Sequence, residues 1–457
     1  MLPNEEGDAY SYLRAIESLR AGMSGGTFAI SDLFGFWLPI YQLICALISL
    51  LVGQPLLVAK LISALCGIGV CILVFRISLQ LTGNRNLSLL AFALIAFNPI
   101  HIMYSSFSMT DVPHAFLVIC SLYFAIKKRW LLAACFVAVG SLMRVESWPL
   151  ILLLPVLQWL LERRVSLTSC CIAFVGPLFW LYICWAATGN PFEYFEVRSS
   201  YVNAVRDTSF SLSRVAVSVG ALAYSVNPAL VLACLTAGWV IVKRMRERRE
   251  WRISESRFPI LATIAFFVSS LGFVLLSYVT NNQPGILPRY GLIMFALGIP
   301  VLSWSFLVAR DWKRPRVLGY LVIAAALCLS QWSLQLVNGV AFVNHVAQKR
   351  AIADYLKGEY QTNPGLNILC PDSTVRVLSG IPEGRFIDSS NCPDKIEPFL
   401  AYLKENRVEY VIFDRMEGVI PASPLAELGE METRGLVQPV IRVDSTRYSL
   451  GLWKCEM

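Results

Sequence analysis

The chain has 457 residues, of which 56% are hydrophobic and 15% charged, and its formal net charge is +8. This composition, with a mean hydropathy of +0.58, excludes a protein that is soluble and globular throughout. The excess of basic residues does not indicate a nucleic-acid partner, because those residues collect in short loops between long apolar stretches.

Apolar stretches long enough to cross a hydrocarbon core of roughly 30 Å recur between residues 56 and 338. We therefore predict a mainly α-helical, polytopic transmembrane bundle of about ten spans over 56–338. The predicted spans are 56–77, 86–104, 112–126, 130–143, 148–162, 167–186, 215–242, 258–280, 286–308 and 317–338. The preceding stretch 37–53 contains Pro39 and is followed at once by Pro55, so we expect a half-inserted or surface-lying helix there.

Lys and Arg collect in alternate loops, which the positive-inside rule assigns to the cytoplasm. These loops contain Arg76, Arg85, Lys127, Lys128, Arg129, Arg163, Arg164, the run 243–252, Arg310, Lys313, Arg314 and Arg316. The run 243–252 is expected to meet anionic membrane lipids. An even number of spans then places residues 1–55, a first loop with juxtamembrane helices, and the C-terminal part on the extracytoplasmic side of a plasma (inner) membrane.

Nothing before Glu5 could carry the amino terminus across a bilayer. We therefore expect a preceding signal-anchor helix that this sequence lacks. The alternative is that the terminus is translocated without an anchor.

Residues 340–457 have a mixed polar and apolar pattern that predicts a small soluble α/β domain. Residues 366–370, 408–413 and 448–453 are expected to be strands, and 398–405 a short helix. The domain could recognise the acceptor or act as a structural cap. Cys370, Cys392 and Cys455 lie in it, where an oxidising compartment would allow one pair to form a disulfide, although the sequence does not indicate which.

Two acidic sites stand out at the ends of apolar segments. Asp111 lies in the run Met109-Thr110-Asp111-Val112-Pro113, and a second cluster near the start of the chain contains Glu5, Glu6 and Asp8. A carboxylate at the edge of a membrane span is energetically costly, so its presence there usually indicates a function. Asp111 could instead cap the helix that begins at Val112, and the N-terminal acids could be solvated charges.

The order of motifs resembles the membrane glycosyltransferases of the GT-C superfamily, particularly the dolichyl-phosphate-mannose protein mannosyltransferases and the aminoarabinose transferases. The resemblance covers roughly residues 3–165 and has a weaker echo at 288–290. Its motifs are Pro3-Asn4-Glu5-Glu6-Gly7-Asp8-Ala9-Tyr10, Trp37-Leu38-Pro39-Ile40-Tyr41, the segment 58–65, Asn98-Pro99, Met109-Thr110-Asp111 and Pro288-Arg289-Tyr290.

The resemblance implies a polyprenyl-phosphate-linked sugar donor and an inverting displacement. Its first acidic position would fall on Asp8 or Glu6, and its second on Asp111. This chain has Glu5-Glu6-Gly7-Asp8 where an Asp-Glu pair is commoner, and the spacing of Asp8 to Tyr10 favours Asp8. An acceptor hydroxyl needs a carboxylate to take its proton, so Asp8 is the predicted general base.

The departing phosphate needs nearby cations. Arg144, Arg289 and Lys60 are the candidates, since each falls at the outer end of a span, and Tyr290 accompanies Arg289. Each of these residues also has a purely structural explanation. Arg144 could pair with Glu146 in a turn, Lys60 could extend to the membrane–water interface, and Arg289 and Tyr290 could be anchors at that interface. His114 is expected to be a packed histidine. Mg²⁺ or Mn²⁺ could bridge carboxylate and phosphate, but the spacing does not require a metal.

The function predicted from the sequence is transfer of a sugar from a polyprenyl-phosphate donor to a lipid, glycan or protein acceptor outside the cytoplasm. The loop 189–214 could line the acceptor side. The alternative function is transport or flipping of a lipid-linked or anionic substrate, which usually leaves internal repeats and interrupted helices. A polysaccharide polymerase or ligase would normally lack a soluble tail of this kind.

Overall fold

The computed structural model describes residues 7–205, 227–248, 255–279, 288–309, 325–326, 329, 347–370, 372–387, 392–393, 396–416, 428–445 and 448–455. The chain divides into two units. One contains residues 16–202 and 208–337, and we call it the helical unit; the other contains residues 1–15, 203–207 and 338–457, and we call it the α/β unit.

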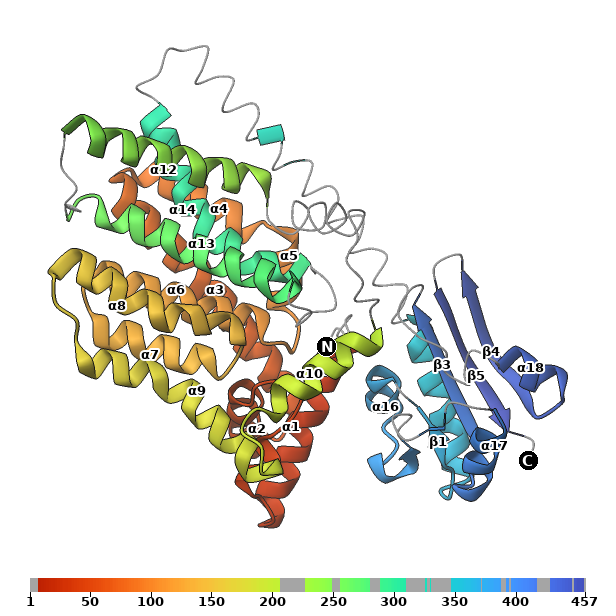
Figure 1. Cartoon of the computed structure of the whole chain (residues 1–457). Coiled ribbons are helices and arrows are strands. Elements are labelled where there is room, and N and C mark those ends of the chain that lie inside the picture. Colours follow the sequence, from red (N-terminus) through yellow and green to blue (C-terminus); the bar gives the residue numbers. More distant parts are fainter. Residues whose placement is uncertain are drawn as a thin grey trace. The chain divides into compact units, whose positions relative to one another are not determined.

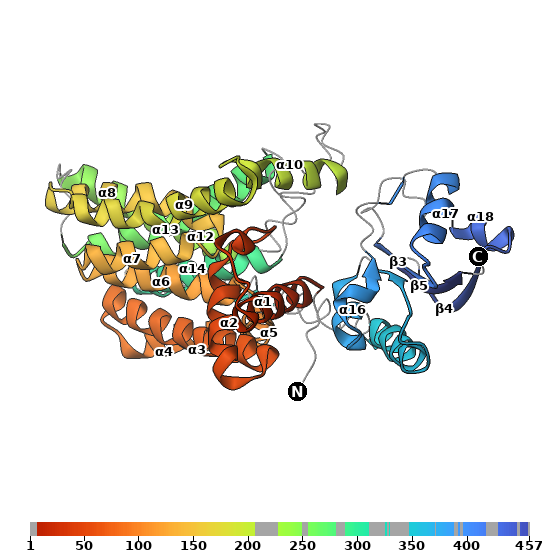
Figure 2. The same cartoon turned by 90° about the horizontal axis from the view of Figure 1, so that it is seen from below.

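The helical unit is built from apolar helices that run alongside one another (Figures 1 and 2). Its elements are η1 (Ile30–Leu33), α2 (Ile40–Val52), α3 (Pro55–Thr82), α4 (Arg85–Ala96), α5 (Pro99–Ser105), α6 (Asp111–Ile126), α7 (Trp130–Ser141), η2 (Val145–Ser147), α8 (Trp148–Glu162), α9 (Leu167–Thr188), α10 (Glu193–Val205), α12 (Pro228–Arg248), α13 (Phe258–Val279), η3 (Pro288–Tyr290) and α14 (Gly291–Ala309). Helix α1 (Gly7–Gly25) begins in the α/β unit and ends in the helical unit, and the last three residues of α10 belong to the α/β unit.

Proline and glycine set the limits of the long helix α3. Pro55 occupies its first turn, where the missing N–H costs no hydrogen bond. Gly83 ends it at φ 62°, a left-handed conformation in which the Gly83 N–H binds the carbonyl of Leu79. Helix α2 likewise starts only after Pro39 and ends at Gly53, within the stretch expected to hold a short helix.

The span predicted over 86–104 is wrong as a single helix. It is two helices, α4 and α5, bent by 61°. The chain breaks at Asn98-Pro99, because Pro99 has no N–H to continue α4 and the Asn98 side chain accepts a hydrogen bond from the His101 N–H to start α5.

Five described helices are long and apolar enough to cross a membrane, or six if α4 and α5 form one broken span. Four shorter apolar helices, α2, α6, α7 and the apolar part of α12, have 10–17 residues. Residues 215–226 of one predicted span and nearly all of the predicted span 317–338 lie outside the described residues. The number of spans therefore remains a prediction.

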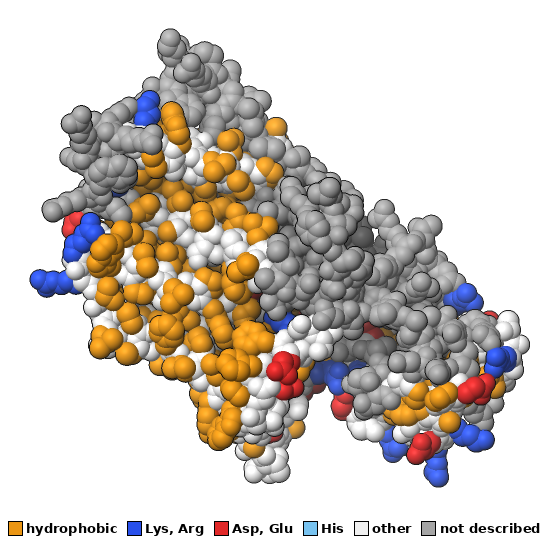
Figure 3. Space-filling model, viewed as in Figure 1, with side chains coloured by type: hydrophobic (Ala, Val, Ile, Leu, Met, Phe, Trp, Pro, Cys, Tyr) orange, Lys and Arg blue, Asp and Glu red, His pale blue; other side chains and the backbone are white. Residues whose placement is uncertain are grey.

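The outer surface of these helices is apolar. Figure 3 shows hydrophobic side chains covering the visible face of the helical unit, with charged side chains at its edges. On α3 the exposed residues recur with helical periodicity and include Leu61, Leu65, Ile68 and Ile72. An exposed apolar surface of this kind is typical of contact with lipid, and the chain is an integral membrane protein.

Helix α14 lies at the centre of the helical unit. Of its span Gly291–Val308, 83% is buried, more than in any other candidate span among the described residues. It packs against α3, α4, α6, α12 and α13. The segment just before α14 is η3, which carries Arg289, and this packing holds it near α6, which carries Asp111.

The α/β unit contains a five-stranded sheet with strand order β2-β1-β3-β5-β4. Strands β1 (Ile368–Leu369), β2 (Phe386–Ile387) and β3 (Tyr410–Met416) are parallel, whereas β5 (Tyr448–Cys455) is antiparallel to both β3 and β4 (Val437–Ser445).

Helices cover both faces of this sheet because side chains alternate along its strands. Ile368 and Tyr410 face a cluster that includes the helix 347–362 and α16 (Ser373–Ser379), while Leu369 and Val411 face α17 (Ile396–Glu405) and α18 (Leu428–Thr433). The predicted α/β domain is present, with its helix and all three predicted strands in place.

Candidate active site

Arg144 bridges two carboxylates inside the helical unit. Its Nη1 donates to Asp111 Oδ1 at 2.8 Å and its Nη2 donates to Glu146 Oε1 at 2.7 Å. The side chains of Asp111, Arg144 and Glu146 are only 2%, 13% and 6% exposed. A guanidinium suits this position because its rigid fork presents several N–H donors to two partners at once.

Local structure holds the three groups in place. Asp111 is the first residue of α6, and Arg144 stands in extended conformation between α7 and η2, which carries Glu146. His114, one turn along α6, lies 2.7 Å through its Nε2 from Ser147 Oγ. This contact fastens η2 to α6, so both carboxylates face the same guanidinium.

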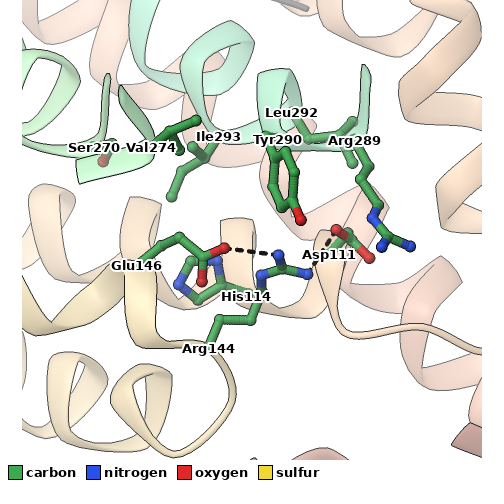
Figure 4. Close-up of a pocket in the computed structure, with 10 residues that line it drawn as sticks. All are labelled: Asp111, His114, Arg144, Glu146, Ser270, Val274, Arg289, Tyr290, Leu292 and Ile293. Atoms are coloured by element: carbon green, nitrogen blue, oxygen red, sulfur yellow. Dashed lines mark hydrogen bonds and ion pairs between the residues drawn. The ribbon is translucent and has the colours of Figure 1, made fainter. Parts of the chain in front are cut away.

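A second arginine reaches the same place from η3. Arg289 and Tyr290 line a pocket with Asp111, Arg144 and Glu146 (Figure 4). The remaining lining residues are His114, Ser270, Val274, Leu292 and Ile293. The pocket therefore joins α6, the α7–η2 turn, α13, η3 and the start of α14.

The ring of Tyr290 contacts both guanidiniums. Its centroid lies 5.4 Å from Cζ of Arg144 and 5.8 Å from Cζ of Arg289, distances at which a cation is attracted to an aromatic ring. The pocket is small, because the volume that water can occupy in it is about 20 Å³, enough for a single water molecule. A bound phosphate would compete with Asp111 and Glu146 for the donors of Arg144.

Asp111 is more than a helix cap. The cap position of α6 is Thr110, and Asp111 Oδ1 is used by Arg144. Its Oδ2 is buried without a hydrogen-bond partner in the described part of the chain. A buried carboxylate oxygen of this kind is costly to leave unpaired, so it favours a ligand that donates a hydrogen bond.

A third arginine belongs to the same electrostatic environment. Arg198, on α10, donates from Nη1 to the hydroxyl of Tyr194 at 2.6 Å. Burial would lower the pKa of Arg198, but the nearby Tyr194, Tyr290 and Glu146 hold it above its usual value. Burial raises the pKa of Tyr194, which therefore stays protonated. Helix α10 thus contributes a cation next to the pocket.

The structure brings together four of the seven site residues predicted from the sequence: Asp111, Arg144, Arg289 and Tyr290. Lys60 is half-buried on α3 and does not line the pocket. Asp8 is half-buried in the first turn of α1, in the α/β unit, and Glu6 lies outside the described residues. The catalytic and binding roles of all seven remain predictions.

Glu146 and His114 are pocket residues that the sequence analysis considered but did not place among the seven predicted site residues. The pairing of Arg144 with Glu146 was expected only as a local turn contact, and it is present together with the bridge to Asp111. The Arg-x-Glu spacing is the sequence feature that could have identified Glu146 as a pocket residue. No sequence feature distinguishes Ser270, since it is one of many small polar residues in an apolar helix.

The charged residues of the pocket do not fit a divalent cation between them. A divalent cation between Asp111 and Glu146 would have to occupy the space of the Arg144 guanidinium, which binds one oxygen of each carboxylate. Within the described ranges, no group of three or more His, Cys, Asp or Glu side chains could hold a metal ion.

The fold and this pocket define a helical membrane protein with a buried cluster of acidic and basic residues and a small α/β unit. Two crystal structures of ArnT from Cupriavidus metallidurans share the fold, one in the apo state with a TM-score of 0.57 and one bound to undecaprenyl phosphate with a TM-score of 0.53. Each match has 15% sequence identity and covers 99% of this chain and 93% of the ArnT chain. The predicted fold, a helical membrane bundle with a small C-terminal α/β part, is confirmed, and it is shared with ArnT. No protein-family model and no curated protein sequence matches the chain.

Proposed function

We propose that this protein is a glycosyltransferase that moves a sugar from a polyprenyl-phosphate donor to an acceptor on the extracytoplasmic side of the membrane. The observation that carries the proposal is the buried bridge Asp111–Arg144–Glu146 next to Arg289, inside a fold shared with an ArnT that binds undecaprenyl phosphate. The fold supports a lipid-linked donor, and the pocket supplies cations for its phosphate.

The arginines at the pocket support a phosphate as the ligand. Arg144 and Arg289 line the pocket, and Arg198 lies close enough to interact with Tyr290 and Glu146. Guanidinium groups bind phosphate oxygens well. As the bond to the sugar breaks, negative charge grows on the phosphate, and arginines placed beside it stabilise that charge.

The carboxylates then have different roles. Asp8 takes the proton of the acceptor hydroxyl as that oxygen attacks the anomeric carbon from the side opposite the phosphate, so the configuration inverts. Asp111 orients Arg144 through Oδ1 and offers Oδ2 to a hydroxyl of the bound sugar or acceptor. Glu146 holds the other arm of Arg144 and is released when the phosphate takes its place.

Transfer assays with single substitutions test the proposal. The purified protein is incubated with radiolabelled polyprenyl-phosphate sugars and native membranes, and Asp8→Asn and Asp111→Asn are compared with the wild type. Each is expected to abolish most labelling of the acceptor. Asp32→Asn is the matched control, because Asp32 is exposed and its carboxylate accepts a hydrogen bond from Ala29 N–H in a surface turn. Equal labelling by all variants would contradict the assigned acids.

A flippase would give a different result in the same preparation. It would move the lipid-linked substrate across vesicles without breaking its sugar–phosphate bond. Intact donor recovered on the opposite leaflet, with no labelled acceptor, would therefore favour transport over transfer.

A further inference from the structure

The start of α1 is hydrogen-bonded to the C-terminal part of the chain. Residues 1–15 belong to the same unit as residues 338–457. Ser11 Oγ donates to Ser373 Oγ at 2.9 Å, and Arg14 Nη1 donates to the same oxygen at 3.3 Å. The second arm of Arg14 pairs with Glu383.

Glu383 is itself held by the sheet. Arg376 Nη1 donates to Glu383 Oε1 at 2.7 Å, and the Arg376 side chain is 4% exposed. Its other donors bind the carbonyl of Cys370, just after β1, and that of Ile387, in β2. A buried arginine thus connects the ends of two parallel strands to the carboxylate that Arg14 uses.

Ser373 is held equally firmly. It is the first residue of α16, whose cap residue Asp372 accepts a hydrogen bond from Val375 N–H at 2.9 Å and pairs with Lys349 at 2.5 Å. We call the set Ser11, Arg14, Ser373, Arg376 and Glu383 the α1 joint.

We propose that the α1 joint makes the C-terminal domain a positioning element for Asp8. Ser11 follows Asp8 by three residues and so lies on the same face of α1. Arg14 follows by six residues, about 9 Å along a helix axis. Fixing these two residues holds the first turn of α1, which carries Asp8, against the C-terminal part of the chain. This inference rests on the proposed role of Asp8 as general base.

The contacts of the joint suit positioning better than stability. The side chains of Arg14 and Glu383 are 32% and 55% exposed, and such ion pairs contribute little to folding. A small displacement of a catalytic group, by contrast, can lower a rate roughly a hundredfold. Substitutions at Arg14 should therefore leave the protein folded while they affect catalysis.

A disulfide tests whether the joint exists. In the double variant Ser11→Cys/Ser373→Cys the two side chains are close enough to form a disulfide, and oxidation should link them in peptides identified by mass spectrometry. The control pair Ser24→Cys/Ser373→Cys moves one partner 13 residues along α1, about 20 Å along the axis, and should not link. Absence of the first link, or equal linkage in both pairs, would overturn the joint whether or not the protein transfers sugar.

Kinetics test the positioning role. Arg14→Gln should lower kcat about tenfold, a fraction of the cost of losing a well-placed catalytic group, with the KM for the donor unchanged. Arg14→Gln should not lower kcat further when Asp8 is already replaced by Asn, because Arg14 acts on catalysis only through the Asp8 carboxylate. Glu397→Gln, which removes an exposed ion pair with Arg434 elsewhere in the domain, is the matched control and should behave as the wild type.

The outcomes separate the two proposals. An unchanged kcat in Arg14→Gln, or an additional loss in the Asp8→Asn background, would overturn the positioning role. Full activity of Asp8→Asn would instead overturn the proposed base, and the positioning role with it, even if the disulfide forms.

Discussion

Arg144 is the residue on which the pocket depends. It is nearly buried and makes one hydrogen bond to each of two carboxylates. Removing one partner of a buried ion pair leaves an uncompensated charge, which typically costs about 3–5 kcal/mol. The pocket therefore stays together only while all three groups are present or a ligand replaces one of them.

Replacing Arg144 by lysine keeps the positive charge but removes the planar guanidinium that presents N–H donors to two partners. Arg144→Lys should lower kcat/KM for the donor about a hundredfold, the usual cost of one well-placed donor to a developing anion, because a single ammonium cannot serve Asp111, Glu146 and a phosphate. Steady-state transfer assays measure this. Arg163→Lys is the control, since Arg163 lies over the ring of Trp159 at a helix end; an equal loss in both variants would contradict the assignment.

Removing divalent metals should leave the transfer rate unchanged. Arg144 occupies the space between the two carboxylates that a cation would need, and the arginines neutralise the phosphate directly. The rate is measured after EDTA treatment and dialysis, and again after addition of Mg²⁺ or Mn²⁺. A rate that falls with EDTA and returns with either metal would show that the pocket opens to bind a cation.

At the scale of elements, close helix contacts keep the pocket residues in register. Gly176 of α9 faces α7, where an added Cβ would lie 2.4 Å from the carbonyl oxygen of Ala138 and 2.0 Å from Ser141 Oγ. Helix α7 leads directly into the turn with Arg144 and Glu146. A displacement of α7 would therefore move that turn.

Gly176→Ala should destabilise the protein by about 1–3 kcal/mol, the usual cost of overpacking, because the backbone carbonyl of Ala138 cannot rotate away. Thermal unfolding in detergent measures the change. Gly272→Ala in α13 is the matched control, because nothing lies within 4 Å of its added Cβ, and it should be neutral or slightly stabilising. Equal melting temperatures for the two variants would contradict the close contact.

The apolar stretches and strand patterns predicted most helices and three strands, because hydrophobic periodicity is a local property. The bend at Asn98-Pro99 was missed, although both residues are typical of a helix start, because the apolar run continues through them. Strand β2 has two residues and carries no pattern of its own.

The sequence also predicted Asp111, Arg144, Arg289 and Tyr290 as site residues, each on separate grounds. It could not show that they meet, because Asp111 and Arg144 are 33 residues apart and η3 follows much later in the chain. Tertiary packing around α14 brings them together. Glu146 and His114 were underrated because each has an ordinary local explanation.

At the scale of the whole molecule, the basic loops predict that the C-terminal domain is extracytoplasmic. Alkaline phosphatase fused after residue 457 should be active in cells, because the enzyme matures only outside the cytoplasm. A fusion that ends the chain after Arg163, in a predicted cytoplasmic loop, should be inactive. The opposite pattern of activities would reverse the orientation and place the proposed chemistry on the cytoplasmic side.

The central claim is that the pocket of Asp111, Arg144, Arg289 and Tyr290 binds the phosphate of a polyprenyl-phosphate lipid. The most direct test is photolabelling of the reconstituted protein with a polyprenyl phosphate that carries a photoreactive group beside the phosphate. We predict labelled peptides from the start of α6, the α7–η2 turn or η3, and loss of that labelling when undecaprenyl phosphate is added in excess. Labelling confined to other segments, or labelling that the competitor does not reduce, would contradict the account.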